Sequence, residues 1–91
     1  MLRANDNDSV VLALSALAET LREERRAQRF LDLTGIGTDE LKRRASEPAL
    51  LAALLRFLEA HEPDLLSVAE AVGVKPDELV GARARLEEGQ A

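Results

Sequence analysis

The run HEPD at residues 61–64 places the chain's single histidine, His61, among carboxylates, and these groups have the donor atoms that a metal ion needs. A metal centre needs further ligands, but the chain has no second histidine and no cysteine. We therefore expect His61 to be an exposed residue at a turn between helices. The serines have no obvious base partner that would activate a hydroxyl, and there is no glycine-rich phosphate loop. We expect no enzyme activity, no cofactor and no metal.

Four arginines are spaced as one face of a helix and form the candidate docking site. Arg22, Arg25, Arg26 and Arg29 fall at positions i, i+3, i+4 and i+7. Glutamates lie between them, so one interpretation is a solvated face with ion pairs worth about 0.2–0.5 kcal/mol each. The other interpretation is a docking patch for an anionic partner, either an acidic protein surface or RNA.

Two glycine corners have the spacing of a helix-turn-helix. GIGTDEL at 35–41 and GVKPDEL at 73–79 align at an offset of 38 residues. A DNA-reading helix usually presents Arg, Lys, Asn, Gln or Ser from its first turn to the major groove. The corresponding first turns here carry acids: Asp39, Glu40, Asp77 and Glu78. We therefore expect no specific DNA binding through these corners. We expect Gly35 and Gly73 to end helices in the left-handed conformation.

The elements that carry these residues are helices. Hydrophobic residues make up 46% of the chain and are mainly Ala and Leu, whereas aromatic residues make up 2%, which is typical of an all-α protein. A flexible tail is expected at 1–8, a single helical domain at 9–88 and a short tail at 89–91. Within the domain we expect about six short helices as two weakly repeated three-helix units, at 9–21, 24–34, 38–46, 48–60, 63–72 and 76–88. Candidate caps are Asp8 or Ser9, Thr38 and Ser46.

The run ALLAALLRFL at 49–58 is apolar around almost its whole circumference, with Arg56 as its only charged residue. A helix of this kind is buried on most sides. It is either the hub of the domain or part of a dimer contact. We favour the hub, because five other amphipathic helices need a surface on which to pack.

Several segments together resemble a known family. They are the run RFLDLTGIGTDELKRRASEPALLAALLRFL, the later LLSVAEAVGV, and ARARL. These segments resemble a family of short bacterial proteins known only as a domain of unknown function, and the similarity spans roughly residues 10–86. The resemblance implies a small helical fold and supplies no activity, substrate, cofactor or site. The chain departs from the family pattern near residues 23–24, where that pattern has a proline-containing turn.

The charge balance bears on the class of partner. The formal net charge of −5 argues against non-specific binding to nucleic acid or to anionic lipid. No apolar run reaches the roughly 18 residues of a membrane span. The apolar run at 10–18 follows an acidic leader, unlike a signal peptide, so we expect a cytoplasmic protein. The sequence predicts a protein–protein interaction module. The alternative is a nucleic-acid-binding protein with a helix-turn-helix-like corner, and monomer and homodimer are both left open.

Overall fold

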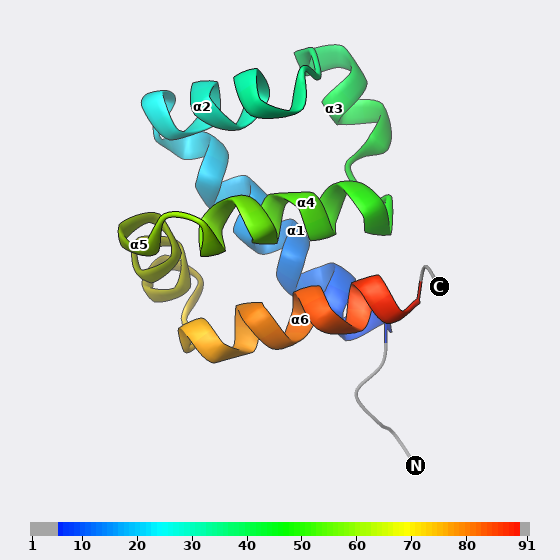
Figure 1. Cartoon of the computed structure of the whole chain (residues 1–91), viewed down its shortest axis with the longest axis vertical. Helices are drawn as coiled ribbons and strands as arrows, with labels where there is room; N and C mark the ends of the chain where they lie inside the picture. The colour runs from blue at the N-terminus through cyan, green and yellow to red at the C-terminus, as the bar shows by residue number, and fades with distance from the viewer. Residues whose placement is uncertain (1–5, 90–91) are drawn as a thin grey trace.

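The computed structural model describes residues 6–89 and arranges them as six helices with no strand (Figure 1). This confirms the predicted all-α fold. The helices are α1 (Asp6–Arg22), α2 (Glu24–Thr34), α3 (Thr38–Arg44), α4 (Pro48–Glu59), α5 (Glu62–Val72) and α6 (Pro76–Glu88). Within this described part of the chain, no helix is both long and apolar enough to cross a membrane.

The chain turns from α1 into α2 at a single residue, Glu23. Its backbone is extended, and its carboxylate accepts hydrogen bonds from the amides of Arg25 (3.3 Å) and Arg26 (2.8 Å). The side chain therefore satisfies two of the amides that a helix start leaves without partners. The break expected between the predicted helices 9–21 and 24–34 is confirmed, and the Glu23 side chain caps the second of them.

Both glycine corners adopt the expected backbone. Gly35 has φ of 71° and Gly73 has φ of 88°, and these are the only positive φ values among the described residues. The amide of Gly35 donates to the carbonyl of Leu31 (2.8 Å), and the amide of Gly73 donates to that of Ala69 (2.9 Å). Each glycine thus closes the helix before it, as predicted. That the two corners superpose as one repeated three-helix unit stays a prediction.

The predicted caps at three helix starts are wrong. Helix α1 begins at Asp6, so Ser9 lies inside it, is fully buried, and accepts a hydrogen bond from Nε of Arg85 (2.8 Å). Thr38 and Ser46 do not cap either, because Gly37 and Glu47 occupy the cap positions of α3 and α4. Residues 1–5 and 90–91 of the expected tails lie outside the described residues.

Helix α4 lies in the middle of the molecule, with α2 and α3 on one side and α6 on the other (Figure 1). It packs against α1, α5 and α6, and Leu54, Leu55 and Leu58 are completely buried. Phe57 meets Phe30 of α2 edge to face, with ring centroids 5.4 Å apart. The predicted hub is confirmed, because these side chains are buried within a single chain and need no second copy to cover them.

Candidate functional site

The four arginines do not form one continuous stripe. Helix α1 ends at Arg22 and α2 begins at Glu24, so the helical spacing on which the stripe depends is interrupted between them. Arg22 lies on α1, whereas Arg25, Arg26 and Arg29 lie on α2. The expectation of a single arginine face is therefore wrong, and each side chain has its own surroundings.

Arg26 points into the protein and is only 8% exposed. Its Nε donates to the carbonyl of Thr20 (3.2 Å), and its terminal NH2 donates to the carbonyl of Glu19 (2.6 Å). These carbonyls belong to the last turn of α1, which has no helical amides left to bind them. Arg26 thus fastens the start of α2 to the end of α1, and its donors are used within the chain.

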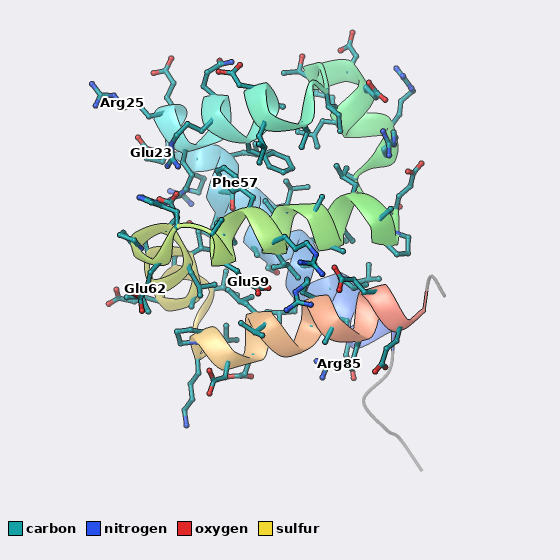
Figure 2. All side chains as sticks on the ribbon, in the orientation of Figure 1. Glu23, Arg25, Phe57, Glu59, Glu62 and Arg85 are labelled. Atoms are coloured by element: carbon teal, nitrogen blue, oxygen red, sulfur yellow. The ribbon has the colours of Figure 1, made fainter. Side chains whose placement is uncertain are left out.

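Arg22 and Arg25 fit the interpretation that these arginines form an exposed, solvated surface. The side chain of Arg22 is 76% exposed, and its nearest carboxylate oxygen, on Glu19, lies 3.8 Å away. The Arg25 side chain extends outward from the start of α2 (Figure 2). Ion pairs at such exposed positions contribute little to stability.

Arg29 is the one arginine of the four that joins α2 to a distant helix. It donates to Oδ2 of Asp64 on α5 (2.7 Å), and its guanidinium carbon lies 5.5 Å from the ring centroid of Phe57 on α4. The side chain is still 47% exposed, so the guanidinium also faces solvent. It therefore has a fixed position and room for a further partner.

His61 approaches the same carboxylate from the turn before α5. Its Nδ1 lies 2.9 Å from Oδ2 of Asp64, and its side chain is 52% exposed, as expected for a turn residue. Burial raises the pKa of Asp64, but the hydrogen bonds from Arg29 and His61 and the positive charge of Arg29 outweigh burial and leave this pKa below its ordinary value. Asp64 thus stays ionised and holds Arg29 and His61 at the edge of one groove.

The groove has a volume of about 490 Å³ and lies between α2, α4 and the turn that joins α4 to α5. Its lining is Arg29, Asp32, Leu33, Phe57, Ala60 and His61. Leu33 stands at its edge and is 70% exposed. Phe57 extends from α4 toward α2 (Figure 2). The groove combines apolar side chains with a guanidinium and a carboxylate, a composition found at protein interfaces.

Sequence reasoning found Arg29 but missed the rest of the groove. A signal was present at Leu33, which lies one helical turn after Arg29 and places a large apolar side chain next to the charged face of α2. Nothing local indicates that Phe57 and His61 meet this face. Across residues 6–89, no three His, Cys, Asp or Glu side chains gather where they could hold a metal ion.

Comparison with known proteins identifies one family. The model of the family described as "Protein of unknown function (DUF3572)" matches residues 6–89, so the chain belongs to this family, as the resemblance indicated. No curated protein and no solved structure matches the chain.

Proposed function

We propose that this member of a family of unknown function acts by binding another protein through the groove between α2, α4 and α5. The observation that carries the proposal is Leu33, 70% exposed at the edge of a groove that Arg29 and Phe57 also line. Arginine and aromatic side chains are enriched at protein interfaces and among the residues that dominate their affinity. A partner's apolar side chain seated here would cover Leu33 and the exposed edge of Phe57.

The charges of the groove favour a protein over a nucleic acid. Arg29 and Asp32 both line the groove, so charges of both signs face the same opening. A polypeptide can offer hydrogen bonds to both signs, whereas a phosphate backbone is repelled by carboxylates. The net charge of −5 also disfavours the binding of a nucleic acid.

The glycine corner at residues 73–79 gives little support to the alternative function, a nucleic-acid-binding protein. Asp77 and Glu78 are exposed on the first turn of α6, and the Glu78 carboxylate accepts a hydrogen bond from the amide of Lys75 (2.9 Å). Entry of this turn into a groove of DNA would bring both acids close to phosphates. We therefore propose that the protein does not bind DNA specifically. We also propose that it is cytoplasmic and has no catalytic activity, as expected from the sequence.

The test begins with affinity capture from native lysate, with and without nuclease, followed by purification of the captured protein. Calorimetric titration should show that Leu33→Glu weakens binding at least about tenfold, which corresponds to about 1.4 kcal/mol. Leu66→Glu is the matched control, because Leu66 is 48% exposed and does not line the groove. Equal loss in both variants, or capture that nuclease abolishes, would contradict the proposal.

Oligomeric state is measured in the same samples by sedimentation. A protein that is dimeric as wild type and monomeric as Leu33→Glu would place a second copy of the chain in the groove. That result would replace the proposed partner with the chain itself.

A further inference from the structure

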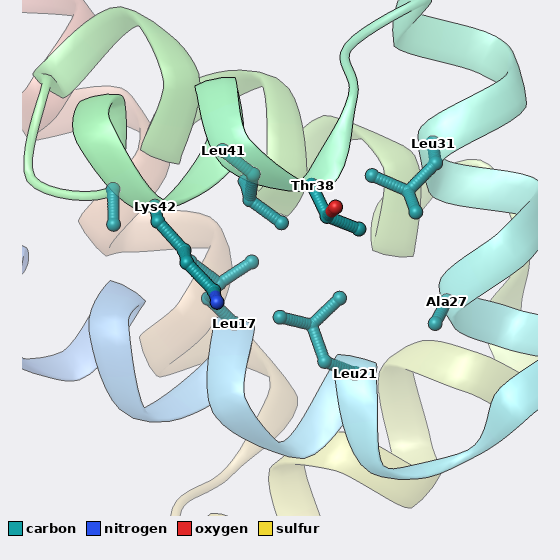
Figure 3. A pocket seen from close by; sticks show the side chains of 8 residues that line it. Leu17, Leu21, Ala27, Leu31, Thr38, Leu41 and Lys42 are labelled. Carbon is teal, nitrogen blue, oxygen red and sulfur yellow. The ribbon is translucent and has the colours of Figure 1, made fainter.

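A second hollow lies on the other flank of α2, between α1, α2 and α3 (Figure 3). Its volume is about 350 Å³, within the range of pockets that hold small molecules. Ala27 and Leu31 of α2 line it, whereas Arg29 and Leu33 line the groove described above. The two hollows therefore use different faces of the same helix, and a ligand in this second hollow would bind independently of the proposed protein partner.

The walls of this pocket are almost entirely aliphatic. Leu17 and Leu41 are more than 90% buried and belong to the core, whereas Leu21 and Leu31 are only partly buried. The remaining lining is Ala27, Thr38, Lys42 and Ala45. An alkyl chain of a ligand would therefore replace water against leucine side chains, and each methylene buried in this way favours binding.

Among residues 6–89, Lys42 is the only charged side chain that lines the pocket. It is exposed, and no carboxylate of the described residues lies within ion-pair distance of its ammonium. Arg44 on the same helix differs, because it pairs with Glu40 (3.0 Å) and Glu47 (2.8 Å). In Figure 3 the Lys42 side chain extends from α3 toward α1. A single cation without a counterion thus borders an aliphatic pocket.

We propose that this pocket binds a free medium-chain fatty acid, with the alkyl chain between the leucines and the carboxylate on Lys42. One ammonium matches one negative charge, so a monoanionic carboxylate suits the site. The charge-assisted hydrogen bond from Lys42 fixes which end of the ligand faces solvent. Thr38, one helical turn before Lys42, offers the other polar side chain of the lining.

The first test is a titration of the ¹⁵N-labelled full chain with octanoate, in which binding is measured from the changes in backbone amide chemical shifts. Octanol and octylamine carry the same chain with a neutral or cationic head, and acetate carries the head without the chain. Octanoate should bind at least about tenfold more tightly than octanol, whereas octylamine and acetate should show no saturable binding. The largest shifts should fall on residues 17–21, 27–31 and 38–45.

Variants separate the head from the chain. Lys42→Met should weaken the binding of octanoate about tenfold and leave the affinity for octanol unchanged. Arg43→Met is the matched control, because Arg43 is exposed beside Lys42 and does not line the pocket, so neither ligand should be affected. Ala27→Leu should fill the pocket and abolish binding of both ligands, with a circular dichroism spectrum like that of the wild type.

Four results would overturn the inference. Octylamine that binds as tightly as octanoate contradicts the assigned head group. An equal effect of Lys42→Met and Arg43→Met shows that net charge, not position, matters. Shifts at Leu33 and Phe57 place the ligand in the other groove. A purified protein partner that Ala27→Leu releases, with no octanoate binding in the wild type, gives the pocket a protein occupant instead.

Discussion

Two arginines that are adjacent in the sequence, Arg25 and Arg26, have opposite surroundings. Arg26 is buried and donates to the carbonyls of Glu19 and Thr20, whereas Arg25 is exposed. Hydrogen bonds from a charged donor contribute about 1.5–3 kcal/mol, and removing the donor leaves buried carbonyls without a partner. Arg26→Gln should therefore lower the free energy of unfolding by about 2 kcal/mol in urea titrations.

Arg25→Gln is the control for this prediction. It removes the same charge from the neighbouring position, and exposed substitutions usually change stability by no more than about 0.5 kcal/mol. An equal loss in both variants would show that the contact between Arg26 and the end of α1 does not hold the two helices together.

Asp64 should make the free energy of unfolding depend on pH in the acidic range. Its pKa is lower in the folded protein than in the unfolded chain, so its contribution is complete above the unfolded pKa of about 3.9 and is lost as pH falls through the lower folded value. Urea unfolding from pH 7 to pH 2 should show Asp64→Asn less stable than wild type at neutral pH. The difference should narrow below about pH 4. A constant difference across this range would contradict the assigned role.

At the scale of elements, the turn between α2 and α3 offers two glycines with different backbones. Gly35 has φ of 71°, whereas Gly37 has φ of −81°, and an added Cβ would meet no atom within 4 Å at either position. Gly35→Ala should cost about 1–2 kcal/mol, because a side chain disfavours the left-handed region. Gly37→Ala should be neutral or slightly stabilising, because it restricts the unfolded chain. Equal urea midpoints would contradict the role of Gly35.

Helix α4 provides the element-scale test of the core. Leu54 is completely buried, so Leu54→Asp places a charge among apolar side chains and removes a large one. The loss should be a large part of the roughly 5–15 kcal/mol that stabilises a small domain, leaving the protein largely unfolded by far-UV circular dichroism. Leu66→Asp, at a 48% exposed position of α5, should stay folded. A Leu54→Asp protein that stays folded and changes its oligomeric state would make α4 an interface.

Helix ends were predictable from the sequence where the backbone itself sets them. Gly35, Gly73, Pro48 and Pro76 act through conformations that do not depend on the rest of the fold, and each lies at a helix boundary as expected. Ser9 shows the limit of this reasoning. A serine hydroxyl can cap a helix or serve a distant donor, and here its partner is Arg85, 76 residues away.

At the scale of the whole molecule, the groove was not predictable because its residues come from α2, from α4 and from the turn that follows α4. Arg29 and Asp64 are 35 residues apart, and local spacing carries no information about which helices pack together. The arginine stripe is wrong for a local reason: its spacing describes one face only within a single helix, and the helix break at Glu23 separates Arg22 from the other three arginines. The burial of α4 was predictable because apolar residues around a whole helix require cover on all sides, whatever the partners are.

Helix α2 lies between the two hollows and contributes lining residues to both. One flank faces the groove with Arg29 and Leu33, and the other faces the aliphatic pocket with Ala27 and Leu31. Between these flanks, Phe30 is completely buried against Phe57. The two proposed sites can therefore be altered independently by substitutions on one helix.

The groove is the central claim, and a titration of the ¹⁵N-labelled chain with the purified captured protein tests it most directly. The account predicts amide shifts concentrated at residues 29–33 and 57–61, a dissociation constant at least about tenfold weaker for Leu33→Glu, and no change for Leu66→Glu. Shifts concentrated at the glycine corner, residues 73–79, with Leu33→Glu binding as tightly as wild type, would contradict it.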